Sequence, residues 1–408
     1  MTTATIEVEP ACPGGPTAAP DLAPTTAPSD RRLVAVRRPC GAIPEATWDA
    51  LAALDPWATP FARWAFHRAW WEAYGGTAHD QTMVVVDRAA GPDGAPLAIV
   101  PLMHRHEIEP NDVASQTTIR HGSTVALTPV PATAKAVFFG ASYHADYATI
   151  LCAPADLAAV ADAVATALAG PTGDPDHPEP WDVVDLRRLR CGDPVADALR
   201  AAFVRRAPEQ SWTVDLERED VCPVATIADD VTDLDGFLST LGKKERHEIR
   251  RKIRRCEAGG DILLTPSPDP LTDLDAFIDL HQRRWGADGL FPATPGGEAS
   301  RIFIRRLFEG FGPDGPARLC FLTVGGRRIA AGITFEAGGT IAYYNAGVDP
   351  DARDLSPGVV MVAKYVERAI ATGRRRLDFL RGNEPYKYEW GARDEPIQRL
   401  LVRRTVDR

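Results

Sequence analysis

Two segments of this 408-residue chain follow the same pattern, and that repeat limits the folds open to it. "WDVVDLRRL" (residues 181–189) and "RRLDFLRG" (residues 375–382) each follow an amphipathic helix, and each carries one acidic residue, Asp185 or Asp378, within an apolar strand. A helix followed by such a strand is typical of a mixed α/β unit. Two copies of one mixed α/β unit explain the pattern most economically, with a predicted boundary near residues 217–223.

The sequence predicts a fold of the α/β class, an α+β arrangement with a mixed sheet, in three parts. Residues 1–30 are rich in Pro, Ala, Thr and Gly without hydrophobic periodicity, so we expect a disordered tail. Residues 31–216 form the first domain and residues 217–408 the second. Helices are expected at 60–74, 154–168, 194–206, 234–258 (one or two), 271–285, 298–311 and from Ser356 to Gly373. Strands are expected at 82–103 (a hairpin), 146–152, 181–189, around Trp212, and at 262–268, 317–325, 327–338, 340–348, 375–380 and 397–404.

Composition excludes several classes of protein. The net charge is −10, so the surface as a whole is unsuited to nucleic acid or an anionic membrane, and any basic site must be local. The seven cysteines are scattered without CxxC or zinc-type spacing, so we expect free thiols and no metal. The N-terminus lacks a signal-peptide pattern, and no segment reaches the roughly 18 uncharged apolar residues of a membrane span. We therefore expect a cytoplasmic protein.

A capped helix is predicted in "LSPGVVMVAKYVERAIATG". Ser356 suits the N-cap and Pro357 the first helical position, and an apolar face continues until Gly373. The unpaired N–H groups at such a helix start can bind an anion such as a pyrophosphate. A plain, well-capped crossover helix fits the same residues, and both interpretations stay open.

A strongly basic segment runs from Lys243 to Arg255. Its apolar residues, Ile249 and Ile253 among them, gather on one side at about 100° per residue, so we predict a helix with one buried stripe. The cations spread over the rest of its surface: Lys243, Lys244, Arg246, His247, Arg250, Arg251, Lys252, Arg254 and Arg255. Such a run is either a solvated face or a contact for a polyanion, such as a phosphate-bearing substrate or RNA.

The segment "RRLDFLRGNEPYKYEWGA" (residues 375–392) holds several candidate site residues. Asp378 lies in the strand, where an unpaired buried carboxylate would cost several kcal/mol, so it is hydrogen-bonded or lies at the strand's end. Glu384, Tyr386 and Lys387 follow on a predicted loop, where ionisable groups could transfer a proton or hold an anionic acceptor. A structural aspartate bonded to turn amides and a surface lysine would fit equally well.

The second half of the chain resembles the CelD-type acetyltransferases, a GNAT-related family that is similar to the Fem peptidyltransferases of peptidoglycan synthesis. Four motifs carry the resemblance in the family's order: "LGKKERHEIRRKIRR", "LHQRRWGADG", "AYYNAGVDPDARDLSPG" and "LDFLRGNEPYKYEWGA". The resemblance covers residues 224–404. It is weaker over residues 48–186, where "ATPFARWAFHRAWWEAYG" and "LAIVPLM" fit the family's degenerate first domain.

The resemblance implies a tandem pair of GNAT-like domains, with the acyl donor held by the second. In such enzymes an amine attacks a thioester directly, so catalysis is mostly positioning and proton removal. Acyl-CoA, in the simplest case acetyl-CoA, is the implied donor. The ordinary GNAT signature Arg/Gln-x-x-Gly-x-Gly/Ala is absent, however, and "RDLSPG" (residues 353–358) stands in its place.

The resemblance and the residue types together assign roles to named positions. Ser356, Pro357 and Gly358 match the donor-phosphate turn, and Tyr343 is expected beside the donor. The expected catalytic residues are Asp378, Glu384, Lys387 and Tyr344, and the expected substrate-binding residues are Arg246, Arg250, Arg284, Trp285, Gly382 and Tyr386. Lys387 and Arg250 would hold the acceptor's negative charge, and Asp378 or Glu384 would manage the proton.

The expected function is N-acyl transfer from acyl-CoA to an amine of an amino sugar, a polysaccharide precursor or a related cell-envelope metabolite. A Fem-like transferase that uses aminoacyl-tRNA is the first alternative, in which the basic helix contacts the RNA. The second alternative is a non-catalytic GNAT-like binding module in exopolysaccharide assembly.

Overall fold

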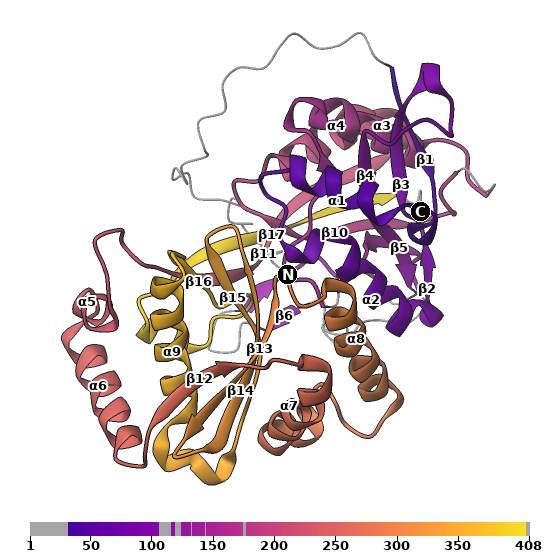
Figure 1. The fold of residues 1–408 in the computed structure, drawn as a ribbon. Coiled ribbons are helices and arrows are strands. Elements are labelled where there is room, and N and C mark those ends of the chain that lie inside the picture. The colour runs from indigo at the N-terminus through magenta and orange to yellow at the C-terminus, as the bar shows by residue number, and fades with distance from the viewer. Residues whose placement is uncertain are drawn as a thin grey trace, which may run out of the picture. The chain divides into compact units, whose positions relative to one another are not determined.

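The computed structural model describes residues 32–105, 116–118, 124–131, 133–142, 144–173 and 177–404 (Figure 1). The tail expected at residues 1–30 lies outside them. The chain forms two compact units. Among the described residues, unit 1 comprises 32–71, 75–220 and 396–404, and unit 2 comprises 72–74 and 221–395. The expected domain boundaries are a sequence-based division, and we keep them as a proposal.

In the residues that the structure describes, unit 1 contains two larger sets of strands, a two-stranded hairpin and four α-helices. An antiparallel sheet has the order β1-β3-β4-β9, and a mixed set of strands has the order β2-β5-β8-β10-β17. The strands are β1 (Leu33–Arg37), β2 (Ala78–Asp80), β3 (Met83–Asp87), β4 (Ala98–Val100), β5 (Leu102–Arg105), β8 (Ala136–Phe139), β9 (Leu151–Cys152), β10 (Val183–Arg190) and β17 (Arg393–Arg404), with a small hairpin of β6 (Gln116–Thr118) and β7 (Thr124–Ala126). The helices are α1 (Glu45–Leu54), α2 (Trp64–Tyr74), α3 (Leu157–Ala169) and α4 (Pro194–Gln210).

Two expected elements of unit 1 are shorter than predicted. The helix expected at 60–74 is a 3-10 turn (Pro60–Ala62) followed by α2, because Arg63 between them adopts an extended backbone conformation. In the strand expected at 146–152, only Leu151 and Cys152 pair as β9. The predicted hairpin at 82–103 is confirmed by the antiparallel pairing of β3 with β4.

Unit 2 is one mixed sheet covered by helices on both faces. Its strands have the order β12-β13-β14-β15-β16-β11. The strands are the second part of β11 (Trp212–Thr226), from Val221 onwards, and β12 (Ile262–Pro266), β13 (Ala317–Val324), β14 (Arg327–Ala337), β15 (Thr340–Val348) and β16 (Arg376–Asp378). The helices are α5 (Leu234–Ser239), α6 (Lys243–Glu257), α7 (Pro270–Trp285), α8 (Pro295–Phe311), α9 (Pro357–Ala371) and α10 (Pro385–Glu389). Helices α5, α6 and α9 share one apolar core with the sheet, and α7 and α8 pack on its other face (Figure 1).

The predicted repeat is confirmed by the strand pairing. In unit 1, β8 and β10 are parallel and α3 connects them, and in unit 2, β15 and β16 are parallel and α9 connects them. Asp185 lies one residue after the last β8–β10 pair, and Asp378 forms the last β15–β16 pair. The mixed α/β fold class is therefore correct.

Ion pairs with buried arginines explain how Asp185 is accommodated inside the strand. Its carboxylate accepts hydrogen bonds from Arg399 at 2.6 and 2.7 Å and from Arg187 at 3.0 Å, and all three side chains are buried. Arg399 also donates to the carbonyl of Thr128 at 2.8 Å. A buried carboxylate with this number of cationic donors does not incur the cost of an unpaired one.

The expectation of seven free thiols is only partly correct. Five cysteines are free and buried: Cys40, Cys152, Cys222, Cys256 and Cys320. Cys191 is disulfide-bonded, so the expectation is wrong at that residue. Within the part of the chain that the structure describes, none of the helices combines the length and the apolar character that crossing a membrane requires.

Candidate functional site

The two parallel strands of unit 2 pair over a short distance and then part. Residue pairs Thr340–Arg376, Ile341–Leu377 and Ala342–Asp378 form the ladder. Strand β16 ends at Asp378, whereas β15 continues to Val348. Among the described residues no ladder pairs β16 with β15 beyond Ala342, so this edge of β15 offers backbone N–H and C=O groups to a ligand.

A β-bulge lies at the point where the strands part. Thr334 of β14 pairs with Tyr343, but Ile333 pairs with Asn345, so Tyr344 is the extra residue. Tyr343 contacts Tyr365 of α9, with ring centroids 5.3 Å apart, and Tyr344 contacts Phe335 at 5.0 Å. Bulges often redirect side chains next to active sites, and this one places both predicted tyrosines at the opening.

Asp378 is a buried carboxylate bonded to a turn. The residue is only 4% exposed, and its Oδ1 accepts a hydrogen bond from the N–H of Leu380 at 2.8 Å. Leu380 has φ +56°, a conformation that costs energy for a residue with a side chain. The carboxylate therefore holds this left-handed turn. Its expected part in proton transfer stays a prediction.

Lys387 holds the loop that follows. The residue is 2% exposed, and its ammonium donates to the carbonyls of Leu380 and Arg381 at 3.0 Å and of Gly382 at 2.8 Å. Glu384 Oε2 lies 2.9 Å from the same nitrogen. An ammonium has three protons, so three carbonyls account for its whole capacity to donate. The alternative of a surface lysine is wrong.

Residues 385–389 form the short helix α10, not the predicted loop. Pro385 occupies its first position, where a missing N–H costs nothing. A five-residue helix is too short to display a hydrophobic period, which is why the pattern did not indicate it. Gly382 precedes it with φ +106°, a backbone conformation that residues with a side chain rarely adopt, so the backbone favours glycine there.

Arg284 lies close enough to the phenols of Tyr343 and Tyr386 for its charge to act on both. Burial raises the pKa of Tyr343 to about 12, and the charge of Arg284 opposes the shift. Burial also raises the pKa of Tyr386, the neighbouring Tyr343 and Glu384 add to the rise, and Arg284 again opposes it. Both phenols are therefore neutral at pH 7 and can donate hydrogen bonds. The Arg284 guanidinium lies over the Trp285 ring, 4.7 Å from its centroid.

The start of α9 differs from the predicted cap. Ser356 adopts a left-handed conformation (φ 53°, ψ 51°), and its side chain caps no N–H group, so the expected side-chain N-cap is wrong. The Ser356 carbonyl instead accepts the N–H groups of Val359 and Val360. Gly358 faces open space, because a Cβ built there would meet no atom within 4 Å. The first turn of α9 thus has room for a ligand beside it.

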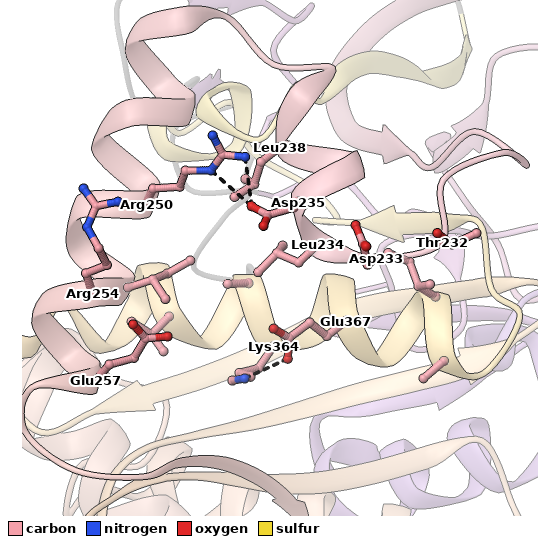
Figure 2. A pocket seen from close by; sticks show the side chains of 15 residues that line it. Thr232, Asp233, Leu234, Asp235, Leu238, Arg250, Arg254, Glu257, Lys364 and Glu367 are labelled. Atoms are coloured by element: carbon pink, nitrogen blue, oxygen red, sulfur yellow. Dashed lines mark hydrogen bonds and ion pairs between the residues drawn. The ribbon is translucent and has the colours of Figure 1, made fainter.

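Arg246 and Arg250 belong to a different surface. Arg250 pairs with Asp235 at 2.8 Å, and Arg246 donates to the carbonyl of Ser239 at 3.3 Å. In the described residues no contact joins them to Asp378 or Lys387. Arg250 instead lines a groove of about 930 Å³ between α5, α6 and α9 (Figure 2).

The groove was not predicted from the sequence. Its lining residues are Thr232, Asp233, Leu234, Asp235, Leu238, Arg250, Ile253, Arg254, Glu257, Val360, Ala363, Lys364, Glu367, Ile370 and Ala371. They come from segments more than 100 residues apart, so no local pattern could indicate it. Among the described side chains, no three from His, Cys, Asp and Glu are grouped to hold a metal ion.

Comparison with known proteins identifies the second unit. Residues 243–388 match the family model described as acetyltransferase (GNAT) domain. They form a GNAT domain. The match contains α6, the parting strands β15 and β16, and the start of α9, so the candidate site lies within it.

A solved structure is similar in fold over most of the chain. The crystal structure of FemX shares 12% sequence identity, with a TM-score of 0.51, and the alignment covers 87% of this chain and 96% of that chain. A tandem GNAT protein from the clavulanic acid biosynthesis pathway shares 12% identity, with a TM-score of 0.42, and covers 92% of this chain and 100% of that chain. At these identities the FemX likeness concerns the fold alone. No curated protein matches the chain in sequence.

Proposed function

We propose that this protein is an N-acyltransferase that moves an acyl group from acyl-CoA to an amine. The observation that carries the proposal is the opening between β15 and β16, with the start of α9 following β15 after one 3-10 segment (Pro350–Leu355). A GNAT domain model matches these residues. The opening offers a strand edge and the helix offers a free N-terminus, and these suit two different parts of one donor.

The donor fits the residues present. The amides of an extended phosphopantetheine arm can pair with the free edge of β15 beyond Ala342, as an added strand does. Its pyrophosphate can lie at the start of α9, where N–H groups and the helix dipole favour negative charge. Gly358 leaves the space open there. Ser356, Pro357, Gly358 and Tyr343 keep their proposed donor-binding roles.

The transfer itself needs positioning and one proton acceptor. The acceptor nitrogen attacks the thioester carbonyl carbon, a C–N bond forms, and the C–S bond breaks. The sulfur leaves as a thiolate and takes up a proton, and the amine loses one. Glu384 is partly exposed and is proposed as the group that receives the amine proton. Tyr386, whose phenol stays protonated at pH 7, is proposed to donate a hydrogen bond to the departing thiolate.

We propose that Arg284 binds the negatively charged group of the acceptor. This guanidinium lies near Tyr343 and Tyr386, and in the described residues it has no carboxylate partner. Lys387 is proposed to shape the loop that carries Glu384, because its protons already serve three carbonyls. An amino sugar, a polysaccharide precursor or a related cell-envelope metabolite is the proposed acceptor class, and the resemblance to the CelD-type family supports it.

A thermal-shift titration tests donor binding. Acetyl-CoA, longer acyl-CoAs and free CoA are added to the purified protein, and a ligand that binds only the folded state must raise the melting temperature. We expect a saturable rise that Gly358→Trp abolishes, because the indole would fill the open space beside α9. Gly296→Trp, at another unobstructed glycine, is the matched control. Absence of a shift with every CoA species would contradict the proposal and favour charged tRNA as the donor, with the non-catalytic module as the remaining alternative.

Aminoacyl-tRNA is the second candidate donor, and the basic face of α6 favours it. The helix contains eight arginine and lysine residues against three glutamates. Binding through several phosphates would weaken by orders of magnitude, roughly 10³-fold or more for six contacts, between 50 and 200 mM salt. A fluorescence-anisotropy titration of labelled aminoacyl-tRNA at both salt concentrations distinguishes this donor from acyl-CoA.

A further inference from the structure

The solvent face of α6 carries uncompensated positive charge. The helix has a net charge of +5, whereas the whole chain has a net charge of −10. Arg250 pairs with Asp235, and Arg251 and Lys252 pair with Glu248. In the described part of the chain, the exposed cations Lys243, Lys244, Arg254 and Arg255 have no carboxylate partner. Such a face on an acidic protein attracts an acidic partner.

The groove beside α6 has an apolar floor of helical length. Its floor is formed by Leu234, Leu238, Ile253, Val360, Ala363 and Ile370. From Val360 to Ala371 it follows α9 for about 16 Å, at 1.5 Å per residue, which is three helical turns. A groove of this length between helices is suited to one face of a short amphipathic helix.

The charges around the groove favour an acidic occupant on the α6 side. Four carboxylates line the groove. Asp235 is paired with Arg250 at 2.8 Å and Glu367 with Lys364 at 2.8 Å, and Asp233 accepts the Gly236 N–H at the start of α5. On the α6 side, the exposed Glu257 stands against two arginines, Arg250 and Arg254. Arg254 is unpaired and projects next to Arg250, one turn along α6 (Figure 2). Carboxylates on a docked helix can therefore meet Arg254 without breaking either pair.

The groove begins beside the proposed donor turn. The end of α6 contacts the residue before that turn, since a Cβ at Gly259 would lie 3.3 Å from Leu355 Cδ2. The groove itself reaches Val360, in the first turn of α9. The turn Ser356–Gly358 lies between Leu355 and Val360 in the chain. A partner docked in the groove would therefore lie close to the entry for a phosphopantetheine arm.

We propose that the groove docks an acidic amphipathic helix of a carrier protein that presents the acyl group as a thioester on a phosphopantetheine arm. The inference rests on the proposed acyltransferase function and specifies the form of its donor. CoA and such a carrier share the same arm, so the transfer is the one written above, with the thiolate left on the carrier. The apolar floor favours a protein helix over RNA, because phosphates gain nothing from Leu234, Ile253 and Ile370.

The experiment compares two acetyl donors that share the phosphopantetheine arm but attach it either to the nucleotide of CoA or to a carrier protein. Acetyl-CoA and an acetylated acyl carrier protein of fatty-acid synthesis are each supplied to the full chain with the same amine. Binding of the fluorescently labelled carrier is measured separately by anisotropy at 50 and 200 mM salt. The double variant Arg254→Gln/Arg255→Gln removes two of the four unpaired cations, and Arg200→Gln/Arg305→Gln removes two exposed arginines elsewhere as the matched control.

We expect the Arg254/Arg255 variant to weaken carrier binding at least tenfold at 50 mM salt and to leave kcat/KM for acetyl-CoA unchanged. The control variant is expected to bind the carrier like the original protein. Equal binding by both variants, or binding of tRNA or phosphatidylglycerol vesicles in place of the carrier, would overturn the inference. Carrier binding without transfer from either donor would instead contradict the proposed function and leave the docking surface intact.

Discussion

At the residue scale, Lys387 makes the sharpest prediction. Its ammonium is buried with three carbonyls and Glu384, so removal of the charge takes a hydrogen-bond donor from each carbonyl and the ion pair from Glu384. We expect Lys387→Met to lower the free energy of unfolding by about 3 kcal/mol. Urea denaturation measures the change. Lys364→Met is the control, because its pair with Glu367 is partly exposed and contributes less than about 1 kcal/mol. Equal effects would refute a structural role for Lys387.

Two glycines near the candidate site predict opposite effects of the same substitution. Gly382 has φ +106°, and a Cβ there would meet Glu384, so Gly382→Ala should cost about 1–2 kcal/mol of stability. Gly358 lies unobstructed in the first turn of α9, so Gly358→Ala should raise stability by about 0.5 kcal/mol through the unfolded chain. Chemical denaturation of both variants decides, and the same sign for both would contradict the argument.

At the element scale, the residue that caps α4, Asp193, belongs to a buried group that includes Thr149 and Asp55. Thr149 Oγ1 lies 3.1 Å from Asp55 Oδ2 and 3.3 Å from Asp193 Oδ2. One hydroxyl proton can serve only one carboxylate, so the other contact needs a protonated carboxyl group. Burial is the main cause that raises the pKa of Asp193 to about 7, and nearby Asp55 adds to it, whereas Arg190 opposes it. Asp193 also caps α4 at Val195.

This proton makes the stability of α4 depend on pH. Between pH 4 and 7 the folded state holds a proton that the unfolded state has released, so stability falls as pH rises towards 7, by up to about 1.4 kcal/mol per unit. Hydrogen exchange of peptides from residues 194–210, corrected for intrinsic rates, measures the loss from pH 5 to 8. Asp193→Asn keeps a capping side chain without the titration and should flatten the profile. An unchanged profile would assign the pH dependence to another group.

Elements with a long period or a clear cap could be predicted, and those that depend on distant packing could not. Helices α6, α7 and α9 follow from apolar periodicity, and the strands of unit 2 follow from glycine turns such as Gly338–Gly339. The bulge at Tyr344 and the parting of β15 from β16 depend on which strands become neighbours, which no local pattern specifies. The groove likewise needs α5, α6 and α9 together. The roles of Asp378 and Lys387 stayed open for the same reason, since their partners are backbone groups of a folded turn.

At the scale of the whole molecule, the two units repeat one arrangement but differ where a donor would enter. In unit 2 the parallel strands separate after Ala342 and Asp378. In unit 1 the chain after β8 returns to β10, where Ala148 bridges Leu189, and the Ala148 N–H donates to the Arg188 carbonyl at 3.0 Å. Buried Arg399 also occupies the space around Asp185. The edge of β10 that faces β8 is therefore occupied by the chain itself in unit 1, whereas the corresponding strand β16 in unit 2 ends at Asp378.

This difference predicts one donor site per chain. Isothermal titration of the full protein with the acyl-CoA that gives the largest thermal shift should yield a stoichiometry close to one. Gly358→Trp, in unit 2, should remove all of the binding heat, whereas Arg187→Met, in the ion cluster of unit 1, should remove none of it, because that cluster contacts no donor. Two equivalents of donor would contradict the prediction by showing a second site. Binding that survives Gly358→Trp and is lost with Arg187→Met would place the donor in unit 1 and reverse the assignment of the two repeats.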